Sequence, residues 1–182
     1  MILSLDVGFK NTGWVIFHNK ELKGLGIIQT EKADKKGVRI ADDNSDRAQL
    51  IGKELNNIIN AYKVEGIIGE LPSGGSQNAK ASNQMGIATG VVSTVVVLKE
   101  LPCEWCTPTD VKKVVTGKRS ATKDEIMENI SEQFNFKVIE QGNRTVFETP
   151  FGKFNKGKFE HIADAFGTYL ALKNNNLVKM FG

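Results

Sequence analysis

The stretch MILSLDVGFKNTGWVIF, residues 1–17, decides the fold. It opens with an apolar run in which Asp6 is the one charged side chain. Glycine and asparagine residues, which favour turns, separate this run from a second apolar run at residues 14–17. The pattern predicts a β-hairpin. Residues 22–30 then alternate well enough for a further strand, so we expect three antiparallel strands at the start of the chain.

Helices and strands alternate in the rest of the chain. Residues 31–45 are polar and charged and predict an exposed loop. Apolar residues then recur at helical spacing from about Ser45 to Tyr62. The expected later elements are a buried strand at 66–71, a helix at 80–98, a strand at 104–107, a short helix capped by Thr109, a helix capped by Thr122 with Glu125, hairpin-like pieces within 135–158 and a final helix at 159–173.

This order of elements predicts an α/β fold with a mixed five-stranded sheet and helices on both faces. It resembles the ribonuclease H fold. A length of 182 residues fits one hydrophobic core, so we expect a single domain over residues 1–182. The apolar fraction of 40% and the charged fraction of 25% are typical of a globular protein and exclude a disordered or fibrous one.

Membrane, secretory and cysteine signals are weak. No apolar run reaches the ~18 residues of a membrane span, and the N-terminus carries no basic leader, so we expect a cytoplasmic protein. Cys103 and Cys106 form one CxxC, a pattern that suits a redox pair or half a zinc site. Two histidines and no further cysteine complete a zinc site poorly, so we interpret the pair as strand-edge thiols.

Four residues are candidates for one reactive site. Asp6 ends the first strand, and Glu70 closes the apolar run IIGEL, where an ionised carboxylate needs a partner or a cation. The alternative is that Glu70 points to solvent where its strand ends. His161 and Asp164 are three residues apart and project from one face of the final helix. Glu160 lies about 100° around that helix from His161, so a pairing of Glu160 with Asp164 is less favoured.

These side chains predict a particular metal chemistry. Carboxylate oxygens suit Mg²⁺ or Mn²⁺, and a histidine is compatible with both ions. Two such ions about 4 Å apart can activate water and stabilise the leaving oxygen of a phosphodiester. We therefore expect two ions per site and hydrolysis to a 5′-phosphate and a 3′-hydroxyl.

Basic residues gather in two places although the formal net charge is only +3. Residues 112–123 contain five basic and no acidic side chains, and a second cluster lies within residues 153–158. The helix expected to begin at Lys123 adds free backbone amides, which also attract phosphate. The alternative is a solvated basic face. The residues expected to bind nucleic acid are Lys112, Lys113, Lys118, Arg119, Lys123, Ser73, Lys153 and Lys156.

Five segments resemble, in the same order, motifs of the RuvC Holliday-junction resolvases of the ribonuclease-H-like superfamily. They are LSLDVGFKNTGW, IIGELPSGG, SNQMGIATGVVSTVVV, TPTDVKKVVTGKRSATKDEI and FEHIADAFGTYLAL. The resemblance spans nearly the whole chain. DxGxxxxG alone is weak, since actin-like ATPases and sugar kinases share it, whereas TG-x3-A-x-K followed by HxxDA is far more discriminating. The compact chain and its divergent loops suit a phage-type member.

The resemblance implies that Asp6, Glu70, His161 and Asp164 hold the metal ions and that Lys123 contacts the scissile phosphate. It implies an endonuclease for branched DNA, above all four-way junctions, without a nucleotide cofactor. Resolving a junction takes two symmetric nicks, which a two-fold homodimer supplies.

The expected dimer interface is the narrow face around Gly86, Ala88 and Gly90. A close packing of two copies needs small side chains of this kind.

Two departures from the family pattern keep other functions open. The family usually places an aromatic residue just beyond the glutamate that corresponds to Glu70, whereas this chain has Leu71, Pro72 and Ser73. A nuclease for flaps and Y-forks, or a junction-binding module without catalysis, is therefore an alternative. The connection 135–158 is also long, and its phenylalanines could stack on bases, although coverage of the core is favoured.

Overall fold

The computed structural model describes residues 1–34, 37–71, 78–142 and 144–182. Its main sheet has five strands in the order β3-β2-β1-β4-β5. The first three pair antiparallel, and β4 and β5 continue the sheet in parallel with β1. The mixed sheet predicted from the sequence is thus confirmed. The strands are β1 (Ile2–Asp6), β2 (Asn11–His18), β3 (Glu21–Gln29), β4 (Gly66–Glu70) and β5 (Cys103–Cys106).

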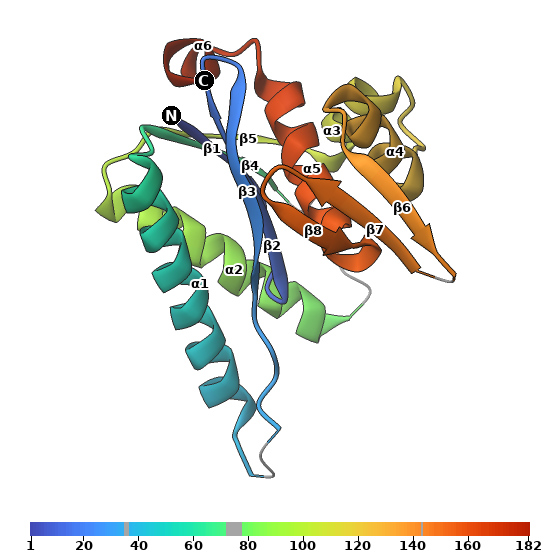
Figure 1. The fold of residues 1–182 in the computed structure, drawn as a ribbon. Coiled ribbons are helices and arrows are strands. Elements are labelled where there is room, and N and C mark those ends of the chain that lie inside the picture. Colours follow the sequence, from blue (N-terminus) through green and yellow to red (C-terminus); the bar gives the residue numbers. More distant parts are fainter. Residues whose placement is uncertain (35–36, 72–77, 143) are drawn as a thin grey trace.

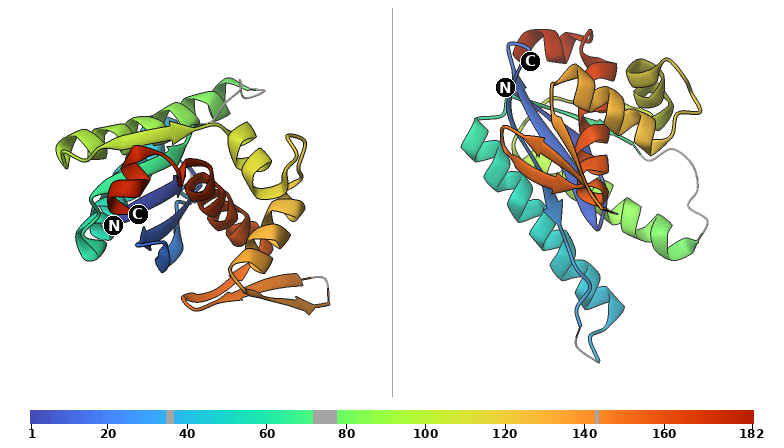
Figure 2. Two further views of the ribbon diagram at one scale, coloured as in Figure 1. Left: turned by 90° about the horizontal axis from the view of Figure 1, so that it is seen from above. Right: turned by 45° about the vertical axis from the view of Figure 1, so that its right-hand side comes forward.

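Helices cover both faces of this sheet, as expected (Figures 1 and 2). One face carries α1 (Ile40–Tyr62) and α2 (Ala79–Leu98). The other carries α5 (Lys156–Leu172), which contacts β2, β1 and β4 and is flanked by α3 (Pro108–Thr116) and α4 (Lys123–Gln133). A short helix that the sequence did not predict, α6 (Asn176–Phe181), ends the chain.

The alternation of side chains along β1 produces two separate cores. Leu3 and Leu5 are fully buried against α1 and α2. Ile2 points to the opposite face, where it joins the cluster around α5, and Ser4 on the same face donates to the Ala165 carbonyl over 2.7 Å. Because side chains alternate with period two, Asp6 also faces α5.

The starts of α1 and α3 differ from the predictions. The chain enters α1 at Ile40 instead of near Ser45, because Asp42 and Asp43 lie in the first turn, where the helix dipole favours negative charge. Polar composition alone therefore misplaced this boundary. In α3 the cap is Thr107 and not Thr109, because Pro108 fits the first helical turn and Asp110 completes a capping box. The capping box of Thr122 and Glu125 in α4 is confirmed.

The described part of the 135–158 connection contains a second, three-stranded antiparallel sheet beside α4 and α5 (Figure 2). Its strands are β6 (Lys137–Gln141), β7 (Arg144–Thr149) and β8 (Gly152–Asn155). Phe147 is buried and stacks on Phe159 with ring centroids 4.0 Å apart, which anchors the small sheet to α5. Phe151 is 43% exposed. Asn155 caps α5, so this helix begins three residues before the predicted Phe159.

The two cysteines lie in β5, the edge strand, as expected. Both are free thiols. Residues three apart in a strand point to opposite faces, and Cys106 interacts with Thr168 of α5 while Cys103 packs with the α1 and α2 side. Burial raises the pKa of both thiols, to about 11 and about 12. Burial thus keeps both thiols in the protonated form, which is the less reactive form of cysteine.

The exposed side of α2 is unusual for a soluble helix. Ala88 is fully buried, so it does not share the open face of Gly86 and Gly90 that the sequence suggested. A Cβ added at either glycine would meet no atom within 4 Å. Val97 and Leu98 are also exposed. By length and composition alone, Ala79–Leu98 is apolar enough to cross a membrane, and only 11% of the tested window is buried.

Gly13 sets the distance between β2 and α5. A Cβ at this position would lie 2.0 Å from the His161 carbonyl oxygen, which belongs to helix backbone and cannot move aside alone. We expect Gly13→Ala to lower the free energy of unfolding by at least about 2 kcal/mol. Gly52→Ala in α1 is the matched control, because its Cβ would meet Val91 at an ordinary 3.5 Å. Urea denaturation measures both, and an equal effect of the two changes would contradict this packing.

Candidate active site

Asp6 and Glu70 lie side by side at the carboxyl ends of two neighbouring parallel strands. They are register partners in the β1–β4 pair, and both face α5. Their position follows from the sequence, because each closes an apolar run that the sheet buries. The solvent-exit alternative for Glu70 is excluded, since its carboxyl is largely buried beside other charges.

Helix α5 brings its own two candidates to the same place. His161 Nδ1 lies 2.7 Å from Asp6 Oδ2, and the two side chains are only 21% and 17% exposed. Asp164 is one turn further along and is strongly buried. The close approach at Gly13 and the Ser4 hydrogen bond hold this part of α5 against β1 and β2.

Burial, and after it mutual repulsion, disfavours the ionised form of these carboxylates. Burial raises the pKa of Glu70 to about 8, and the charges of Asp6 and Asp164 add to the rise. Burial and then Asp6 likewise raise the pKa of Asp164. For His161, burial lowers the pKa, but the hydrogen bond and charge of Asp6 outweigh it, so the net pKa is raised. Three acids thus share a space with too little positive charge.

These residues fit a divalent cation by their chemistry. Oxygen donors and one imidazole are the ligands that Mg²⁺ and Mn²⁺ accept, and the repelling carboxylates lack the counter-charge that such an ion supplies. The side chains are not preset as a cage: among the described residues, no group of three or more acids, histidines or cysteines could hold a metal ion as it stands. One Asp6 oxygen is instead hydrogen-bonded to His161.

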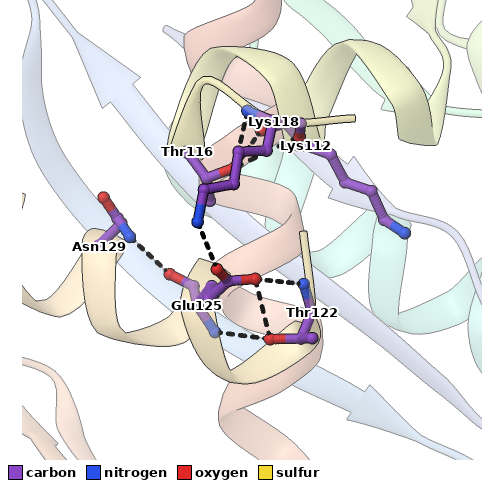
Figure 3. A network of polar contacts seen from close by, with 6 residues as sticks. All are labelled: Lys112, Thr116, Lys118, Thr122, Glu125 and Asn129. Atoms are coloured by element: carbon purple, nitrogen blue, oxygen red, sulfur yellow. Dashed lines mark hydrogen bonds and ion pairs between the residues drawn. The ribbon is translucent and has the colours of Figure 1, made fainter. Parts of the chain in front are cut away.

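Two of the predicted cations stand beside the carboxylates. Lys112 from α3 and Lys123 from α4 both lower the pKa of Glu70, and Lys123 also lowers that of Asp164. Figure 3 shows how α3 and α4 are joined: Lys118 donates to Glu125 over 2.9 Å, and Glu125 also closes the cap of α4 with Thr122. This link fixes the N-terminus of α4, where Lys123 begins the helix.

The other predicted nucleic-acid residues are distributed less favourably. Lys113 and Arg119 are exposed, and within the described part of the chain no salt bridge engages them. Lys153 pairs with Glu148 at 3.3 Å and Lys156 with Asp124 at 2.8 Å, so a carboxylate already neutralises each of them. Ser73 lies outside the described residues.

Sequence reasoning missed two polar neighbours of His161. Glu160 was set aside because it lies about 100° around the helix, yet its Oε1 is 3.5 Å from His161 Nε2 and 3.1 Å from Lys123 Nζ. Asn11 Nδ2 lies 3.2 Å from the same imidazole nitrogen. Asn11 was interpreted only as a turn residue. Its position at the start of β2, next to the end of β1 where Asp6 lies, could have identified it as a neighbour of the site.

The carboxylates of β1, β4 and α5 meet at the carboxyl ends of the central strands of a mixed five-stranded sheet. This arrangement defines a nuclease site of the ribonuclease-H-like class. Comparison of sequences gives the family. The profile of "Crossover junction endodeoxyribonuclease RuvC" matches residues 2–143. The chain belongs to the RuvC family of crossover junction endodeoxyribonucleases.

Individual relatives agree with this assignment. The RuvC of a Wolbachia from Brugia malayi is 31% identical over 132 residues, which cover 69% of this chain and 75% of the relative. The RuvC of Pseudothermotoga lettingae is 27% identical over 143 residues, 76% of this chain and 83% of the relative. The family implies a divalent-metal-dependent nuclease.

Solved structures support the same fold. A Thermus thermophilus RuvC bound to a Holliday junction substrate superimposes with a TM-score of 0.66 at 16% identity, covering 93% of this chain and 90% of that one. The yeast mitochondrial Holliday junction resolvase gives 0.54 at 13% identity, with 98% and 83% covered. The profile match ends before α5, so the case for His161 and Asp164 depends on the geometry described above.

The raised pKa of Glu70 predicts how stability changes with pH when no metal is present. Between its ordinary value of 4.5 and about 8, the unfolded chain has lost the Glu70 proton while the folded protein keeps it. The free energy of unfolding should therefore fall as pH rises through this window, and Glu70→Gln should flatten the fall. Thermal melts in chelator from about pH 5 to pH 8.5 measure it. Parallel curves for both proteins would contradict the burial described here.

Proposed function

We propose that this protein is a homodimeric endonuclease, dependent on Mg²⁺ or Mn²⁺, that resolves four-way DNA junctions by two symmetric nicks. Each cut leaves a 5′-phosphate and a 3′-hydroxyl. The observation that carries the proposal is the meeting of Asp6, Glu70 and Asp164 beside Lys112 and Lys123. Family membership supports the substrate class.

Each side chain has a role in this reaction. The carboxylates and His161 would hold two divalent ions, which activate water and stabilise the leaving oxygen. Lys123, 61% exposed and beside the carboxylates, would contact the scissile phosphate, and Lys112 would neutralise a neighbouring charge. The free amides at the start of α4 add an anion site at the same edge. Lys113 and Arg119 are free to follow the DNA backbone.

A second copy of the chain would pack on the open side of α2. Gly86 and Gly90 leave room for close approach, and the exposed Val97 continues their stripe at helical spacing. Burying this apolar surface would stabilise a dimer, and a two-fold axis there gives the two equivalent sites that paired nicks need. A monomeric mass at working concentration would contradict this arrangement.

A second candidate function is cleavage of flaps and Y-forks. The observation that favours it is Leu71, 37% exposed, at a position where RuvC proteins usually carry an aromatic side chain for junction stacking. A nuclease without this stacking would select less strictly for the open centre of a junction. Labelled four-way, Y-shaped and linear duplexes, incubated with and without each metal, separate the two functions.

We predict that Asp6→Asn and Asp164→Asn each reduce junction cleavage by at least about 10²-fold. Removing a residue that only contacts a metal ligand already lowers activity by about 10- to 100-fold, and removing the ligand itself should lower it more. Binding of the junction should persist, since the basic residues are unchanged. Gel shifts and nicking of a labelled junction measure the two effects.

Asp46→Asn is the control for this experiment. Asp46 is an exposed carboxylate on α1, and this helix covers the face of the sheet opposite to α5. It should cleave normally. Intact nicking by either site variant would refute the assignment of the ligands, and junction binding without nicking by the unaltered protein would identify a non-catalytic binding module.

A further inference from the structure

Glu160 lies between two groups of the proposed site. Its Oε1 atom is 3.1 Å from Lys123 Nζ and 3.5 Å from His161 Nε2, so a single carboxylate oxygen faces both an ammonium and an imidazole nitrogen. The Glu160 side chain is 25% exposed, which leaves it at the rim of the site and not among the buried carboxylates.

The orientation of the imidazole decides which nitrogen can serve the site. Nδ1 faces Asp6 Oδ2 at 2.7 Å, so this nitrogen is directed at the carboxylates. An imidazole holds a metal through an unprotonated nitrogen, and a ligating histidine usually donates its other N–H to a carboxylate or carbonyl. If His161 is a ligand through Nδ1, its proton is on Nε2 and needs an acceptor.

Two described side chains contact Nε2. Asn11 presents its amide nitrogen at 3.2 Å, and its Oδ1 is already engaged by a hydrogen bond from Gln29 at 3.1 Å. An amide N–H cannot accept a hydrogen bond from Nε2–H. Glu160 Oε1 can. In the protein without metal, Nδ1 faces Asp6 and Asn11 approaches Nε2 through its amide nitrogen.

We propose that Glu160 is a positioning residue that orients His161 as a metal ligand and Lys123 toward the scissile phosphate. This inference rests on the proposed metal site. A merely structural ion pair is a poor alternative, because Lys123 is 61% exposed and pairs of this kind add little to stability. The carboxylate thus connects the metal ligands on α5 with the phosphate contact at the start of α4.

Metal affinity without DNA gives the first test. We expect Glu160→Ala to weaken Mn²⁺ binding, measured by titration calorimetry, by about 10- to 100-fold, the usual effect of losing an outer-shell partner. Glu160→Gln keeps a carbonyl acceptor at the same reach and should restore most of the affinity. Glu148→Ala is the matched control, because it removes a similar pair, with Lys153 at 3.3 Å, away from His161. It should bind Mn²⁺ normally.

The results distinguish this inference from the proposed function. Unchanged Mn²⁺ affinity in Glu160→Ala overturns the positioning role, because the side chain then contributes nothing to metal binding. A loss of affinity in Glu160→Gln equal to that in Glu160→Ala also overturns it, because it indicates that the carboxylate is a direct ligand. If Asp6→Asn also binds Mn²⁺ as tightly as the unaltered protein, the metal site itself fails. Thermal melts of each metal-free variant confirm that the fold is kept.

A double-mutant cycle tests the second half of the role. Glu160→Ala and Lys123→Ala, alone and together, are compared by kcat on a labelled junction at saturating Mn²⁺. If Glu160 acts through Lys123, removing Glu160 should lower kcat less in the Lys123→Ala background than in the unaltered protein. The two free-energy losses are then not additive. Fully additive losses would overturn the connection to Lys123.

Discussion

Desolvated negative charge at the ends of β1 and β4 is the constraint on which this structure depends. The sheet places Asp6 and Glu70 in adjacent register, and α5 then covers them and adds Asp164. Such a group is unfavourable without positive charge nearby, as the raised pKa of Glu70 shows. The close approach of α5 at Gly13 maintains this arrangement, and a divalent cation would relieve it.

The surrounding cations differ in how available they are. Lys153 and Lys156 are occupied by nearby carboxylates, and Lys118 is used to join α3 to α4. Lys112 and Lys123 act on the buried acids, and Lys123 does so while it also pairs with Glu160 at 3.1 Å at the rim of the site. The number of basic residues in the sequence therefore overstates the number that are available to bind DNA. The three-dimensional pairing selects the part of the basic surface that faces the site.

Much of the fold could be predicted because its signals are local. Alternating apolar runs predicted the strands, and the spacing of His161 and Asp164 predicted that both project from one face of the final helix. What failed depended on contacts that a pattern does not contain. Residues 40–44, which the sequence assigned to a polar loop, are helical because the helix dipole favours Asp42 and Asp43. Glu160 was missed because a long side chain can reach back across the angle that separates it from His161. The short α6 has too few residues for a periodic signal.

The claim that a single cation site joins the two ends of the chain has one direct measurement. Crystals grown with Mn²⁺ would be examined by anomalous scattering at the manganese edge. We expect manganese bound by oxygens of Asp6, Glu70 and Asp164, with His161 in contact. Manganese found only elsewhere, at concentrations that support cleavage, would contradict it.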